Sequence, residues 1–176
     1  LDLVDKGLVT DQMVLTVGYD IENLTDPSRR AKFHGAVETD HYGRQIPKQA
    51  HGSINLDGHT SSTRKIMCAV SELFDRIVDK NLLVRRMYVV ANHVLPEADA
   101  PKKNDGAVQL DLFTDYAAQE EKQKAEDAAL ERERKIQKAA LAIKKKYGKN
   151  AILKAMNLEE GATAKDRNAQ IGGHKA

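Results

Sequence analysis

Asp11-Gln12-Met13-Val14-Leu15-Thr16-Val17-Gly18-Tyr19 is the stretch that decides the fold, because its apolar and polar residues alternate with the two-residue period of a β-strand. One side of this strand would carry Met13, Leu15, Val17 and Tyr19, and the other Gln12, Thr16 and Gly18. Val14 interrupts the alternation, which favours a strand covered on both faces.

Two further strands are predicted downstream by the same period. In residues 50–57, Ile54 and Leu56 point one way, and the opposite side carries His51, Ser53 and Asn55. In residues 83–95, Met87, Val89 and Ala91 alternate with a polar set of Arg86, Tyr88 and Asn92. Each strand therefore offers one apolar face for a core and one polar face.

A helix is predicted between these two strands, from a cap at Thr60, Ser61 or Ser62 to about Lys80. Its apolar stripe has the three-to-four spacing of a helix lying on a sheet and consists of Ile66, Val70, Leu73, Phe74 and Ile77. Cys68 lies beside this stripe, so we expect it to be a small buried residue. As the single cysteine of the chain, it also excludes an intramolecular disulfide framework.

The order of these elements predicts an α+β fold, with a small antiparallel or mixed four-stranded sheet backed by two helices on one face. Residues 1–7 have the pattern of the last turns of a helix that ends at a glycine cap, Gly7. We therefore expect the chain to be a fragment that lacks the first strand of the sheet.

Composition divides the 176 residues into four parts. Residues 1–96 hold most of the β-branched and aromatic residues and form the expected domain, whereas residues 97–116 have linker composition. Residues 117–148 are predicted to form a charged helix, and residues 149–176 a short helix capped by Asn150 and a disordered tail. Residues 21–49 form a long polar excursion inside the domain, which favours a functional loop.

The polar faces of the three strands together predict a hydrogen-bonding surface on the uncovered side of the sheet. Its members would be His51, Ser53, Asn55, Arg86, Tyr88 and Asn92, flanked by Arg44, Lys48, Arg64 and Arg85. Neutral donors combined with positive charge suit a nucleic-acid phosphate backbone. The alternative is that antiparallel sheets commonly leave one face in water for solubility alone.

The linker contains an apolar pentapeptide, Gln109-Leu110-Asp111-Leu112-Phe113, between polar and charged segments. An exposed Leu-Phe pair in a flexible peptide favours insertion into a pocket of another protein. The alternative is a linker segment that folds back on its own domain. The pentapeptide resembles the Gln-Leu-Ser/Asp-Leu-Phe peptide with which bacterial polymerases and repair proteins bind the sliding clamp.

Several function classes are excluded or disfavoured by the sequence. A net charge of +2 does not by itself indicate nucleic-acid binding, so only the distribution of charge along the chain can indicate it. We find no segment of membrane-spanning length, no secretory signal and no sign of a small-molecule ligand, and we expect a cytoplasmic protein. The histidines at 34, 41, 51 and 59 lack the spacing and cysteine partners of a zinc site. The pair Asp111 and Asp115 lies in the linker, without a scaffold for a metal.

The predicted domain resembles the little-finger domain of Y-family (UmuC/DinB-like) translesion DNA polymerases. The best matching stretches are residues 8–20, His51-Gly52-Ser53-Ile54-Asn55-Leu56 and Arg85-Arg86-Met87-Tyr88-Val89-Val90-Ala91-Asn92. The tail, residues 145–154, 157–163 and 170–176, is similar to the C-termini of one bacterial branch of the family. In that branch a clamp-binding pentapeptide follows the little finger, as residues 109–113 do here.

This resemblance implies that the chain is the DNA-binding and clamp-tethering C-terminal part of an error-prone polymerase, acting in DNA repair and the SOS response. The implied partners are double-stranded template-primer DNA and the bacterial sliding clamp. Catalysis and its Mg2+ would reside in a palm domain preceding Leu1, so no catalytic or metal residue is assigned. Two alternatives stay open, a non-catalytic clamp-binding repair adaptor and an RNA-binding module that uses Tyr88 as a stacking platform.

Overall fold

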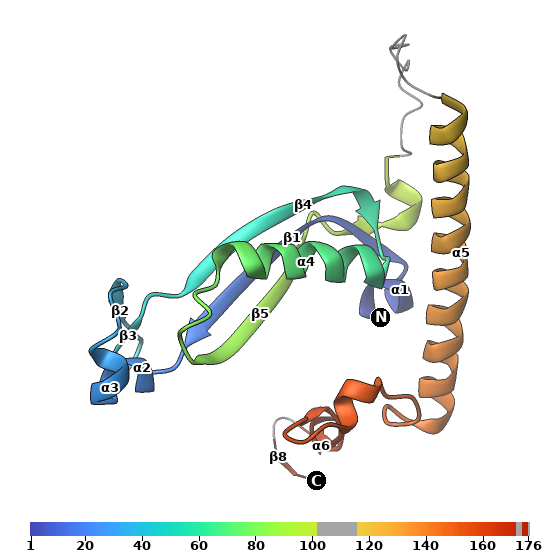
Figure 1. Cartoon of the computed structure of the whole chain (residues 1–176). Coiled ribbons are helices and arrows are strands. Elements are labelled where there is room, and N and C mark those ends of the chain that lie inside the picture. The colour runs from blue at the N-terminus through green and yellow to red at the C-terminus, as the bar shows by residue number, and fades with distance from the viewer. Residues whose placement is uncertain (102–115, 172–173, 176) are drawn as a thin grey trace. The chain divides into compact units, whose positions relative to one another are not determined.

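The computed structural model describes residues 1–101, 116–171 and 174–175, and the chain divides into two compact units (Figure 1). One unit comprises residues 7–107, and the other combines residues 1–6 with residues 108–176. The predicted clamp-binding pentapeptide, residues 109–113, lies outside the described residues.

A four-stranded antiparallel sheet forms the centre of the 7–107 unit (Figure 1). The central strand, β1 (Leu8–Tyr19), lies between β4 (Ala50–Thr60) and β5 (Val84–Asn92). The short strand β6 (Leu95–Pro96) pairs with the start of β1. The α+β class and the antiparallel four-stranded sheet are thus confirmed, and β1 begins three residues before the predicted strand.

The core lies between this sheet and α4 (Thr63–Ile77). Ser62 begins the helix, because its hydroxyl oxygen accepts a hydrogen bond from the Lys65 N–H at 3.2 Å. Leu73 of α4 is fully buried against Leu15 and Val17 of β1. Cys68 is exposed, so the prediction that it is buried was wrong: it lies on the side of α4 that faces away from the core.

The strand β5 remains largely uncovered. Val89 pairs with Leu15 and shares its face, yet Val89 is 52% exposed and Leu15 is 1% exposed. The difference arises because α4 packs across β1 and β4. The second helix expected on this face would be the one that ends at Gly7. It is present as α1 (Asp2–Lys6), but α1 belongs to the other unit.

The long excursion between β1 and β4 is ordered by a buried asparagine. Its elements are α2 (Glu22–Thr25), α3 (Pro27–Arg30) and a hairpin of β2 (Val37–Thr39) and β3 (Gln45–Pro47). Asn23 is 1% exposed; its amide donates to the carbonyls of Asp20 and Leu83 at 2.9 and 3.0 Å. Its oxygen accepts from the Leu83 N–H at 2.9 Å. Asn23 therefore ties the end of β1 to the residue that precedes β5.

The second unit is built on α5 (Tyr116–Tyr147), which ends at Gly148, where φ is +94°. Pairs four residues apart, Lys124–Glu120 at 2.6 Å and Lys135–Glu131 at 2.9 Å, stabilise this charged helix. Within the part of the chain that the structure describes, no helix has the length and apolar character needed to cross a bilayer.

Short elements complete both units. The 3-10 turn η1 (Glu97–Asp99) follows β6, and η2 (Ala155–Leu158), α6 (Ala164–Asn168), β7 (Gln170–Ile171) and β8 (His174–Lys175) follow α5. The prediction of a helix capped by Asn150 was wrong. Its side chain donates to the Lys165 carbonyl at 3.2 Å and accepts from the Asn168 side chain at 2.7 Å, so it joins the turn after α5 to α6 instead.

Candidate nucleic-acid interface

The strand register assembles the polar face that the alternation predicts. Thr16 pairs with His51 on one side and Tyr88 on the other, and Gln12 pairs with Asn55 and Asn92 in the same way. Val14 pairs with Ser53, and Gly18 with Arg86. The six predicted members therefore share one face, the side of the sheet opposite α4, which we call the open face: His51, Ser53, Asn55, Arg86, Tyr88 and Asn92.

Hydrogen bonds across the strands hold the polar side chains of the open face in place. The Gln12 side chain donates to the side-chain oxygen of Asn55 at 2.9 Å and accepts from the side-chain NH2 group of Asn92 at 2.9 Å. Thr16 and His51 are hydrogen-bonded at 2.9 Å. This row of amides, a hydroxyl and an imidazole is preorganised, so it can meet a polar partner with little further loss of side-chain entropy.

Arg86 lies flat along the open face. Its guanidinium carbon is 5.5 Å from the centre of the Tyr88 ring, and its stem crosses Gly18. A Cβ atom added at Gly18 would be 3.1 Å from Arg86 Cγ, so glycine leaves room for the arginine. Arg85 occupies a bulge opposite Gly18 and Tyr19, and its guanidinium contacts the Asp20 carboxylate at 3.3 Å.

A third arginine approaches from the β2–β3 hairpin. Arg44 forms two bonds to one carboxylate oxygen of Asp40, at 2.9 and 2.7 Å, and Asp40 also accepts the backbone N–H groups of Arg44 and Tyr42. The side-chain bond from Arg44 is the main reason that the pKa of Asp40 lies below its usual value of 3.8. The ionised carboxylate therefore stabilises the hairpin tip at neutral pH.

The three arginines meet at one cavity of about 140 Å³, which lies where the hairpin reaches the end of the sheet. Its walls include Gly18, Tyr42, Arg44, Arg85 and Arg86. We call this region the arginine end of the open face. Near the other end of the sheet lies Asp11, which contacts His93 at 2.8 Å and His59 at 3.7 Å. Positive charge is thus concentrated at one end.

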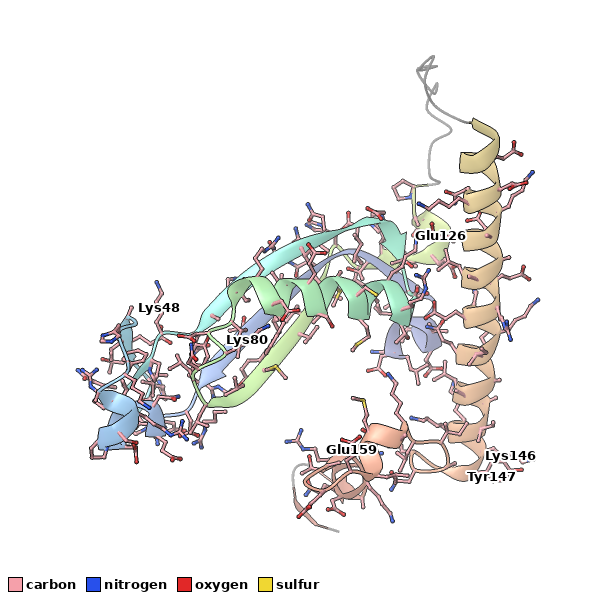
Figure 2. All side chains as sticks on the ribbon, viewed as in Figure 1. Lys48, Lys80, Glu126, Lys146, Tyr147 and Glu159 are labelled. Carbon is pink, nitrogen blue, oxygen red and sulfur yellow. The ribbon has the colours of Figure 1, made fainter. Side chains whose placement is uncertain are left out.

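Two predicted contacts lie apart from this cluster. Lys48 directly follows β3 and lies at the hairpin end of the unit, outside the cavity walls (Figure 2). Arg64 lies in the first turn of α4, in the helix layer on the opposite side of the sheet. Positive charge along the sequence suggested Arg64, but the layer in which it lies separates it from the open face.

Four residues of the interface were not among the contacts predicted from the sequence. Gln12 and Thr16 alternate with the core residues of β1, and that pattern already placed them on the polar side. Tyr42 and Asp40 belong to the hairpin tip, and no local pattern marked them. Among the described residues, no three His, Cys, Asp or Glu side chains gather as a metal-binding group.

Comparison of the chain with family models, with curated proteins and with solved structures found no match.

Proposed function

We propose that the open face binds the phosphate backbone of duplex DNA and that the 109–113 pentapeptide tethers the chain to a bacterial sliding clamp. The chain would then be the C-terminal part of an error-prone translesion polymerase. The observation that carries the proposal is the open face itself, a preorganised polar row that ends in Arg44, Arg85 and Arg86.

The composition of the open face suits a backbone rather than a base-reading interface. Neutral donors at Asn55, Ser53 and Thr16 can bond to phosphate oxygens, and the arginines supply the charge that displaces counterions. Among the paired positions of this face, Tyr88 is the one Phe or Tyr. An RNA-stacking sheet needs two or three aromatic rings, so duplex DNA is the better-supported ligand.

The pentapeptide supplies a second, weaker attachment. Leu112 and Phe113 would fill an apolar pocket of the clamp, and Gln109 would fix the orientation through hydrogen bonds. A linear peptide of this size binds on the order of micromolar, roughly −8 kcal/mol. Tethering to DNA raises the effective concentration of the peptide, so weak binding suffices and permits exchange with the replicative polymerase on the clamp. Polymerisation, with its Mg2+, would belong to the palm domain that the resemblance implies.

The DNA-binding part is tested by fluorescence anisotropy of a labelled template-primer duplex over a series of salt concentrations. We expect Arg86→Ala to weaken binding and to reduce the slope of log K against log[salt] by about 0.9, the loss of one phosphate contact. Lys80→Ala is the matched control. Lys80 pairs with Asp75 at 2.6 Å beside the end of α4, so its substitution changes net charge equally, away from the open face (Figure 2). Equal slopes for the two variants would contradict the proposal.

The tethering part is tested by anisotropy against a purified sliding clamp. The Leu112→Ala/Phe113→Ala double variant should lose saturable binding, whereas Val108→Ala, just outside the pentapeptide, should retain it. Wild-type chain that shows no binding into the high-micromolar range would remove the clamp from the proposal and leave DNA binding in place.

A further inference from the structure

The β2–β3 hairpin presents an aromatic ring that has no role in the core. Tyr42 is 79% exposed, although its backbone is held by bonds of the hairpin tip. The Tyr42 N–H donates to the Asp40 carboxylate at 2.9 Å, and the Gly43 N–H donates to the Asp40 carbonyl at 3.0 Å. Gly43 closes the turn with φ at +76°, a conformation that favours glycine. These bonds fix the backbone of Tyr42 and leave its ring exposed, so the ring is available to a ligand.

The surroundings of Tyr42 combine stacking and charge. The Arg44 guanidinium is 5.2 Å from the centre of the Tyr42 ring, and His41 meets the ring edge-on at 5.4 Å. Tyr42 also lines the cavity at the arginine end, together with Arg85 and Arg86. An aromatic platform beside basic groups is the combination with which proteins bind single-stranded nucleic acid.

The arginines of the cavity differ in how much of their charge is available. Arg44 is paired twice with Asp40, so its charge is largely compensated. Arg85 has one 3.3 Å contact with Asp20, and Arg86 pairs with no carboxylate among the residues that the structure describes. Arg85 and Arg86 are therefore the groups that remain for a phosphate, with Arg44 supporting the ring.

The size of the cavity decides which part of a nucleic acid it can take. A base pair inside a duplex cannot enter a space of about 140 Å³, whereas a group on a strand that leaves the duplex can. We propose that the arginine end binds one unpaired nucleotide next to the duplex, with its phosphate on Arg85 and Arg86 and its base stacked on Tyr42. This inference rests on the proposed function, because the open face must first hold the duplex.

The test uses two labelled probes, a blunt duplex and the same duplex with a single-stranded 5′ extension of the template strand. We expect the wild-type chain to bind the extended probe roughly five- to tenfold more tightly, the lower range for stacking of one base. Tyr42→Ala should abolish this preference, so that the variant binds both probes with equal affinity. Tyr42→Phe keeps the ring and should keep the preference.

A second readout reports stacking directly. With 2-aminopurine as the first unpaired base, wild-type chain and Tyr42→Phe should quench its fluorescence, and Tyr42→Ala should not. Equal binding of both probes by the wild type, or quenching that survives Tyr42→Ala, would overturn this inference alone. Failure to bind either probe would overturn the proposed function as well, so the two failures can be told apart.

Discussion

Replacing Asn23 tests the contact that places the arginines of β5 beside the hairpin. Asn23→Ala removes three hydrogen bonds of the side chain, two with Leu83 and one with the Asp20 carbonyl at the end of β1. The two carbonyls keep a second donor each, because Asn23 N–H still donates to the Asp20 carbonyl and Asp20 N–H to the Leu83 carbonyl. The Leu83 N–H has no such substitute and loses its partner.

The change in the free energy of unfolding can be estimated from these hydrogen bonds. An unsatisfied buried donor costs about 1–3 kcal/mol, and the two other bonds together add only about 0.5–1.5 kcal/mol because both carbonyls keep a second donor. We therefore expect Asn23→Ala to lower the free energy of unfolding by about 2–4 kcal/mol. A domain has only about 5–15 kcal/mol of stability in total, so this is a large fraction.

Hydrogen exchange followed by mass spectrometry measures this effect locally. Peptides covering residues 82–92 should exchange roughly 30- to 700-fold faster in Asn23→Ala than in the wild type, whereas peptides from α5 report on the other unit and should not change. Asn81→Ala is the matched control, because its amide makes only an exposed 3.0 Å bond to Asp79. If residues 82–92 of Asn23→Ala exchange within threefold of the wild-type rate, Asn23 does not hold the end of β1 to Leu83 as described.

An aspartate at the same position separates the donor from the acceptor. Asn23→Asp keeps the oxygen that accepts the Leu83 N–H but replaces the donating amide with a carboxylate that faces two carbonyls. Burial and those carbonyls should raise the pKa of the new carboxyl above its unfolded value. The neutral carboxyl therefore fits the site of Asn23 best. The free energy of unfolding of Asn23→Asp should fall further below that of the wild type as the pH rises through the raised pKa.

Four other outcomes follow from single contacts. Tyr19→Phe removes the hydroxyl that accepts the Asp79 N–H at 2.9 Å, so urea unfolding should show a loss of about 1 kcal/mol. Gly18→Ala puts a methyl group against Arg86, so DNA affinity in the anisotropy assay should fall, but less than in Arg86→Ala because the charge remains. Leu15→Ala should cost about 2–5 kcal/mol in urea unfolding and Val89→Ala less than about 1 kcal/mol, because only Leu15 is buried. The pKa of Asp40 is lowered, so its ion pair stabilises the hairpin at neutral pH and is lost as the pH falls below about 3.8. Amide exchange of the hairpin should therefore become faster at that low pH. Asp40→Asn should show the same faster exchange already at neutral pH.

The open face could be predicted from the sequence because strand alternation is a local property. His51, Ser53 and Asn55 occupy every second position of β4, and any antiparallel register that buries Ile54 must place them together. The exposure of β5 could not be predicted in the same way. Val89 has the same pattern as Leu15, but its exposure depends on where α4 lies across the sheet.

The arginine end could be predicted only in part. Arg44, Arg85 and Arg86 were all expected to contact DNA, Arg86 as a member of the polar face and the other two as separate flanking charges. Their meeting depends on the β2–β3 hairpin, whose strands of three residues each carry too short a pattern to be recognised. The burial of Asn23 could not be predicted from the sequence either, because a single asparagine in a polar loop is ordinarily exposed.

The bulge in β5 explains how two neighbouring arginines serve one cavity. In a regular strand, Arg85 and Arg86 would point to opposite faces of the sheet, and one of them would lie on the side that α4 covers. Here Gly18 pairs with Arg86 and Tyr19 with Val84, so Arg85 is the extra residue and falls out of the alternation. Both guanidinium groups therefore reach the same space beside the hairpin. The register shift thus turns a pair of strand residues into a two-arginine site at the end of the open face.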